Sequence, residues 1–166
     1  MCQSLFHFLT GVDARERFPR KNPLTPDSIN HFYLNQGHII EYFKVGPSRK
    51  RIIVFFWETF EYVIPSHPVH SILEPLDEIG KTTICYGGMI MSLRRFPLFA
   101  DCYRMMRWKY QEKVKARIYT LTHLEPKERL AQLEEDQPWV FDLVREEDIA
   151  SYLRLNVGIL KRLTQY

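Results

Sequence analysis

The chain has 166 residues, of which 45% are hydrophobic and 14% aromatic, and its formal net charge is +3. This hydrophobic content is enough for a packed core, so wholesale disorder is excluded, and the length fits one medium domain or two small ones. A charge of +3 permits contact with nucleic acid without requiring it, because a nucleic-acid-binding surface is marked by a concentrated basic patch.

The three cysteines, Cys2, Cys85 and Cys102, stand far apart and form no CxxC pair. An odd number of scattered cysteines argues against a secreted disulfide framework. No apolar run reaches the roughly 18 residues of a membrane span, and residues 1–21 show no basic start and no signal-peptide cleavage pattern. We therefore expect a reduced, cytoplasmic protein that meets no membrane.

The first region, residues 1–88, is rich in β-branched and aromatic residues, which is typical of half-buried sheet. Apolar runs at 39–43 and 51–57 flank a segment, 44–49, in which glycine is followed by proline. This pattern predicts a β-hairpin. Its tip would carry three basic residues, Arg49, Lys50 and Arg51.

Two further strands are predicted at 71–76 and 81–87. Pro65 and Pro68 exclude a regular central strand over residues 64–71, because proline cannot donate to a strand ladder. That segment is predicted to be a loop.

The second region, residues 89–122, has no glycine and only one proline, Pro97, which is tolerated in the first turn of a helix. Inward positions recur at steps of three or four residues: Phe99, Tyr103, Met106, Tyr110, Val114, Arg117 or Ile118, and Leu121. The pattern predicts one amphipathic helix over 97–122, whose roughly 25 residues would span about 37 Å. A helix this long in a small protein needs a partner surface, and a second copy of itself is an economical choice.

The third region, residues 123–166, begins with a helix predicted after Pro126. The final residues, 146–166, predict two short helices with Asn156 as the N-cap of the second. Their apolar residues would pack the two helices together: Ile149, Ala150, Leu153, Leu155, Leu160 and Leu163. Periodicity leaves two interpretations open, a helix-turn-helix that reads DNA and two packed helices that close a small domain. In the first, Lys161, Arg162 and the amides near Asn156 would contact phosphates or bases.

The segment "IASYLRLNVGILKRL" resembles the helix-turn-helix of Crp/Fnr-type transcription regulators of the Bacteroidetes type, which runs roughly "IASYLGITPETLSRI". The strands "FYLNQGHIIEYF" and "RIIVFFWE" resemble the β-roll of that family, so the resemblance covers about residues 28–166. It implies an α+β fold in which a degenerate, cyclic-nucleotide-binding-like β-roll (1–88) leads through a long dimerisation helix (89–122) to a helix-turn-helix (123–166). The implied function is transcription regulation by a homodimer that binds DNA.

Three departures from the family affect the DNA-binding segment. Arg154 replaces the turn glycine, which takes φ > 0 without strain. Val157, Gly158 and Ile159 replace Pro-Glu-Thr at the start of the recognition helix, and Lys161 replaces a serine. The DNA-binding residues that the resemblance implies are Arg154, Asn156, Lys161 and Arg162.

The family holds the phosphate of a cyclic nucleotide with a helix N-terminus, a Gly-Glu pair and an arginine. This chain has no Gly-Glu there, and the arginine position falls near Val69. A phosphate would be buried with little compensation, so we expect no cyclic nucleotide to bind in the family's manner and identify no cofactor. A pocket for another effector would involve four residues: Tyr62, His67, Val69 and His70.

His67 and His70 lack a nearby third ligand, so we predict no metal site. No Ser/His/Asp or Cys/His grouping is evident, and we predict no catalytic residues and no enzyme. The alternative to a DNA-binding regulator is a β-roll sensor, or a ligand-binding or interaction protein, that does not bind DNA.

Overall fold

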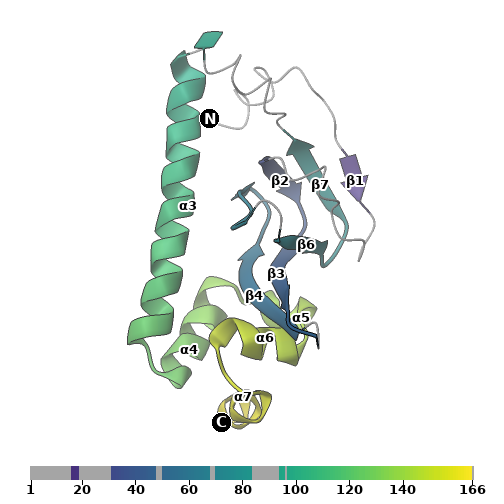
Figure 1. Ribbon diagram of the computed structural model, residues 1–166, viewed down its shortest axis with the longest axis vertical. Helices are drawn as coiled ribbons and strands as arrows, with labels where there is room; N and C mark the ends of the chain where they lie inside the picture. Colours follow the sequence, from purple (N-terminus) through teal and green to yellow (C-terminus); the bar gives the residue numbers. More distant parts are fainter. Residues whose placement is uncertain are drawn as a thin grey trace.

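In the computed structural model the strands gather on one side of a long helix, and the shorter helices lie below them (Figure 1). The structure describes residues 16–18, 31–47, 50–67, 70–83, 94–95 and 97–165, with only the backbone described for 16–18 and 82–83. Within these residues no helix is both long and apolar enough to cross a membrane.

Within the described residues, seven strands form two antiparallel sheets. The first sheet has the order β1 (Glu16–Phe18), β7 (Ile79–Thr83), β2 (Phe32–Gln36), β5 (Tyr62–Val63). The second has the order β4 (Lys50–Trp57), β3 (Ile39–Val45), β6 (Ile72–Pro75). The predicted α+β class is confirmed, since small antiparallel sheets and helices make up the chain.

The predicted hairpin is confirmed, because β3 and β4 pair antiparallel with Val45 opposite Lys50 across the turn. Arg49 lies outside the described residues. The predicted strand at 71–76 corresponds to β6, and the described part of the strand at 81–87 belongs to β7, which begins two residues earlier. The described residues of the 64–71 loop form no strand, as its prolines predicted.

From Pro97 to Gln165 the described chain forms five helices: α3 (Pro97–His123), α4 (Pro126–Asp136), α5 (Val140–Leu143), α6 (Glu146–Leu153) and α7 (Val157–Thr164). α3 has 27 residues and ends one residue beyond the predicted helix. α4 has Pro126 at its start and a capping box between Glu125 and Glu128, so its first turn has internal hydrogen-bond partners.

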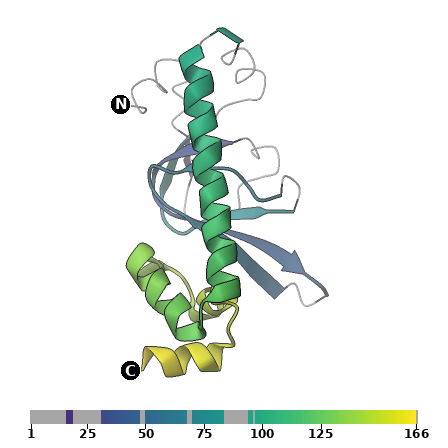
Figure 2. The same ribbon diagram turned by 90° about the vertical axis from the view of Figure 1, so that its left-hand side faces the viewer.

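α3 covers one side of the sheets, whereas α4 to α7 close their lower end (Figure 2). Phe99 of α3 is 1% exposed, and Tyr110 and Val114 pack against the apolar interior of the sheets. A second core cluster joins the strands to the short helices. Its buried members are Ile40, Tyr42, Ile53, Phe56, Leu130, Leu133, Val140, Val144, Ile149, Ala150, Leu153 and Leu160. The short helices therefore rest directly on β3 and β4.

Candidate nucleic-acid interface

The turn between α6 and α7 depends on Arg154, whose φ of 57° and ψ of 42° place it in the left-handed region. This conformation lets the N–H of Leu155 donate to the carbonyl of Ala150 at 2.9 Å, and the N–H of Arg154 donate to that of Ser151 at 3.3 Å. The pattern is a Schellman C-cap. An L-residue in this region carries a strain of about 1–2 kcal/mol that glycine avoids. Arginine nevertheless takes the place of the family's glycine here.

Asn156 begins the second helix, as the sequence predicts. Its side-chain Oδ1 accepts a hydrogen bond from the N–H of Gly158 at 2.7 Å, which satisfies one of the unpaired amides of the first turn. A Cβ added at Gly158 would lie 3.1 Å from that oxygen, so the glycine leaves room for the cap. The side-chain oxygen of Asn156 is therefore occupied by the cap, which leaves its side-chain nitrogen for other partners.

The inward face of the helix pair is apolar. Ile149, Ala150 and Leu153 of α6 and Leu160 of α7 are each no more than 3% exposed, and Leu163 packs against the same cluster. These contacts hold α7 across α6, and they fix which side of α7 faces outward.

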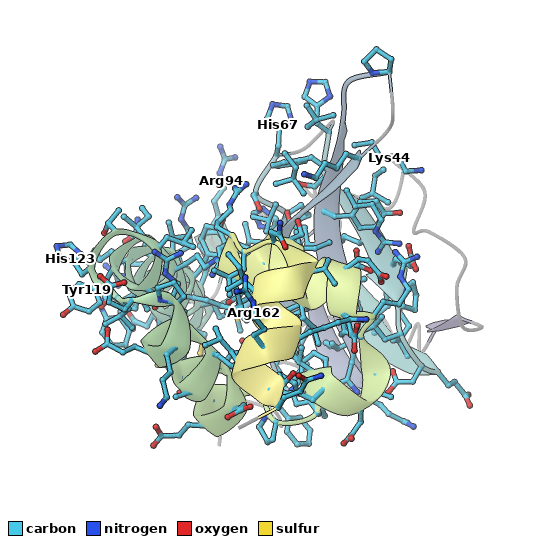
Figure 3. The ribbon with its side chains drawn as sticks, turned by 90° about the horizontal axis from the view of Figure 1, so that it is seen from below. Lys44, His67, Arg94, Tyr119, His123 and Arg162 are labelled. Carbon is cyan, nitrogen blue, oxygen red and sulfur yellow. The ribbon has the colours of Figure 1, made fainter. Side chains whose placement is uncertain are left out.

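The outward face of α7 is basic. Lys161 and Arg162 are exposed, and Ile159 beside them is 37% exposed. Lys161 Nζ lies 3.2 Å from an Oε atom of Glu146, with both side chains more than half exposed, and Arg162 Nε donates to the carbonyl of Gly158 at 3.2 Å. In the view from below, α7 lies nearest the viewer and carries Arg162, whereas Tyr119 and His123 of α3 lie to one side (Figure 3).

Ser151 and Arg51 attach the helix pair to the sheets. The Ser151 hydroxyl donates to the Arg51 carbonyl at 3.1 Å and accepts from the N–H of Ile53 at 3.2 Å, which joins α6 to the backbone of β4. The Arg51 guanidinium lies 3.3 Å from Asp148 of α6 and 3.2 Å from Glu74 of β6. It also lies over the ring of Tyr42 at 3.9 Å.

Two further arginines hold the C-terminal end of α6. Arg129 of α4 donates to the carbonyl of Leu153 at 3.1 Å, and Arg117 of α3 donates to that of Tyr152 and lies 3.5 Å over the Tyr152 ring. Carbonyls at a helix C-terminus have no partner within the helix, so cations stabilise them well. α3 and α4 are thus both attached to the C-terminal end of α6.

An open groove of about 1050 Å³ lies between β4 and the helix pair. Its charged lining consists of four basic residues, Lys50, Arg51, Arg145 and Arg154, and two acidic ones, Glu147 and Asp148. Asp148 is 4% exposed and pairs with both Arg51 and Arg145. The accessible charge in the groove is therefore mainly positive, and it continues to the turn before α7.

Of the predicted pocket residues, the structure brings His67 and His70 into contact. Tyr62 is 9% exposed and packs edge-on against His31, and burial raises the pKa of its hydroxyl. His67 and His70 are exposed and stack on each other at 4.4 Å. Val69 lies outside the described residues.

The sequence interpretation missed Glu41, which lies inside the sheets at 0% exposed. Its carboxylate accepts hydrogen bonds from Trp57 at 3.0 Å and from Ser71 at 2.7 Å, and two more from Ser66. The sequence does contain an indication of this buried carboxylate, because Glu41 is the one charged residue in the apolar run "IIEYF".

The face of α3 turned away from the sheets carries four exposed apolar side chains. Leu98, Met105, Trp108 and Tyr119 are 51%, 40%, 57% and 56% exposed. At 100° per residue they fall within one stripe, opposite the stripe that includes Phe99 and Tyr110. Asp101 and Glu112 lie in the same stripe, so the outward face of α3 combines exposed apolar side chains with charged ones.

No protein-family model matches the chain, and no curated protein matches it. Among solved structures, FixK2 from Bradyrhizobium japonicum is similar with a TM-score of 0.74 at 15% identity, over 93% of this chain and 83% of that one. The c-di-GMP-responsive regulator CLP from Xanthomonas campestris gives 0.68 at 14% identity, over 99% and 90%. A candidate transcriptional regulator of the Crp/Fnr family from Eubacterium rectale gives 0.70 at 12% identity, over 96% and 80%. The chain therefore has the fold of a Crp/Fnr-type, cyclic-nucleotide-binding-like protein, as the C-terminal resemblance predicted.

Proposed function

We propose that this protein is a transcription regulator that binds DNA through α7 as a homodimer. The observation that carries the proposal is the basic outward face of α7, held by an apolar inward face on a Crp/Fnr-type fold. A helix of eight residues is about 12 Å long, which suits insertion into a major groove.

Each basic residue of the helix pair has a role in this proposal. Arg162 and Lys161 would contact base edges or phosphates from α7. Arg154 and the side-chain nitrogen of Asn156 would donate to phosphates beside the turn. Glu146 and Glu147 stabilise the start of α6 through the helix dipole, but they repel a DNA backbone. Lys161 therefore has to exchange its contact with Glu146 for one with DNA.

The dimer would form through the exposed stripe of α3. Leu98, Met105, Trp108 and Tyr119 on each copy would bury one another and leave the sheets on the outside. Two α7 helices related by a two-fold axis would then read half-sites about 34–36 Å apart. In this arrangement residues 1–88 form the β-roll, 89–122 the dimer helix and 123–166 the DNA-binding part.

Fluorescence anisotropy on mixed genomic duplex fragments tests the proposal, at about 50 and 200 mM salt. We expect affinity to fall steeply with salt, and the logarithmic slope to decrease by about 0.9 for each phosphate contact removed. Arg162→Ala should lower affinity in a dimer of unchanged stability. Lys127→Ala, which removes an exposed charge on α4, is the matched control and should bind normally. A folded dimer that fails to bind at low salt would refute DNA binding and favour a sensor or interaction protein.

A further inference from the structure

Glu41 is a buried carboxylate surrounded by donors that have no net charge. Its Oε1 accepts from the backbone N–H of Ser66 at 2.6 Å, from the Ser66 hydroxyl at 2.5 Å and from the Ser71 hydroxyl at 2.7 Å. Its Oε2 accepts from the indole N–H of Trp57 at 3.0 Å. The four donors come from β4 and from the 64–71 loop, and all of them point to one place inside the sheets.

An ionised carboxylate is stable in such a place only if hydrogen bonds or charges replace its lost hydration. The four donors supply that replacement, and hydrogen bonds to a charged acceptor are the stronger kind. The ammonium of Lys113 attracts Glu41 electrostatically but donates its hydrogen bonds to Glu61 at 2.6 Å and to the carbonyl of Phe56 at 2.8 Å. The hydrogen bonds to Glu41 therefore come from neutral donors, which would suit the oxygen of another small carboxylate as well.

The same contacts join the two described ends of the 64–71 segment. Ser71 also accepts from the N–H of His67 at 2.9 Å, so the start and the end of the loop meet at Glu41. The negative charge of Glu41 also contributes, after burial, to the raised pKa of Tyr110 on α3, so the two side chains are close. One carboxylate on β3 thus connects β4 with Ser66 and Ser71.

We propose that the β-roll contains an anion-binding subsite made by Ser66, Ser71 and Trp57, and that Glu41 is its resident anion. The built-in carboxylate holds Ser66, Ser71 and Trp57 together and excludes free carboxylates and phosphates. These three residues therefore reach their arrangement without a diffusible ligand. This inference stands whether or not α7 binds DNA.

Chemical rescue tests the subsite. Glu41→Ala removes the atoms of one acetate ion and leaves the four donors in place. We measure urea unfolding midpoints in sodium acetate and in sodium chloride at equal ionic strength. Wild type should show only the general stabilisation that acetate gives any protein relative to chloride, whereas Glu41→Ala should be destabilised in chloride and restored by acetate to a clearly larger extent. With a dissociation constant on the order of 10 mM, about 0.5 M acetate would raise the folded-to-unfolded ratio roughly 50-fold.

Two controls separate the subsite from general salt effects. Leu73→Ala opens a cavity in the same core, where Leu73 is 4% exposed, but removes no carboxylate, so acetate should stabilise it over chloride no more than it stabilises wild type. Glu41→Ala combined with Ser66→Ala loses a donor and should be rescued less than Glu41→Ala alone. The proposal is overturned if acetate helps Glu41→Ala no more than Leu73→Ala, or if it stabilises wild type equally.

A Glu41→Ala protein that is insoluble in chloride still gives an answer. It is then refolded from urea in parallel in acetate and in chloride, and the soluble yield is compared. Recovery in acetate alone supports the subsite, and failure in both salts overturns it.

Discussion

Replacing Arg154 with glycine should stabilise the protein and weaken its binding to DNA. The φ of 57° at Arg154 costs about 1–2 kcal/mol for an L-residue, and glycine avoids this cost. Glycine also has more conformational freedom in the unfolded chain, which reduces the gain in the free energy of unfolding by about 0.4–1 kcal/mol. We therefore expect a net gain of about 0.5–1 kcal/mol, which raises the melting temperature by roughly 1–4 °C for a chain of this length. Thermal unfolding by circular dichroism measures the shift.

The same substitution removes a charge that the proposed function assigns to a phosphate. For a dimer we expect the slope of log affinity against log salt to decrease by about 2, because each phosphate contact contributes about 0.9. Arg154→Lys is the control, since it keeps both the charge and the strained backbone and should leave stability and slope unchanged. A less stable Arg154→Gly protein would refute the strain argument. A stabilised protein with an unchanged slope would remove Arg154 from the DNA contacts.

Three further perturbations test the cap, the buried tyrosines and the dimer stripe. Asn156→Ala should cost about 1 kcal/mol of unfolding free energy in urea melts, because the first turn of α7 loses its N-cap; an unchanged value would show that the cap contributes nothing. Burial raises the pKa of Tyr42 to about 12, and it also raises the pKa of Tyr62, Tyr110 and Tyr152. These hydroxyls therefore stay protonated in the folded protein at a pH near 10, where tyrosines of the unfolded chain lose their protons. The contribution of these tyrosines to the free energy of unfolding is complete below about pH 10 and is lost as the pH rises through their pKa values in the folded protein. Absorbance at 295 nm should show them ionising only when the protein unfolds. Ionisation before unfolding would contradict their burial. Trp108→Glu places like charges against each other in the proposed dimer and should halve the mass measured by light scattering, whereas Lys127→Ala should not; a variant that stays dimeric would place the interface elsewhere.

Local patterns in the sequence determine the elements of this protein and the outward face of α7. The glycine and proline at 46–47 mark the β3–β4 turn, and Pro97 marks the start of α3. Leu160 and Leu163 occur three residues apart, so Lys161 and Arg162 between them must face away from the core. Such features follow from neighbours within a few residues, because backbone preference and helical period are local properties of the chain.

Only the tertiary structure decides which charged residues are buried and what they hold. Lys113 and Arg117 belong to a basic run that could be a solvated helix face, yet they pair with Glu61 and with the end of α6. Ser151 bonds to β4 across about a hundred residues of sequence. Glu41 is an acid in an apolar strand, and its partners Ser66 and Ser71 are 25 and 30 residues away in the chain. These contacts join segments that are distant in the chain, and their partners become fixed only when the sheets and helices close on one another.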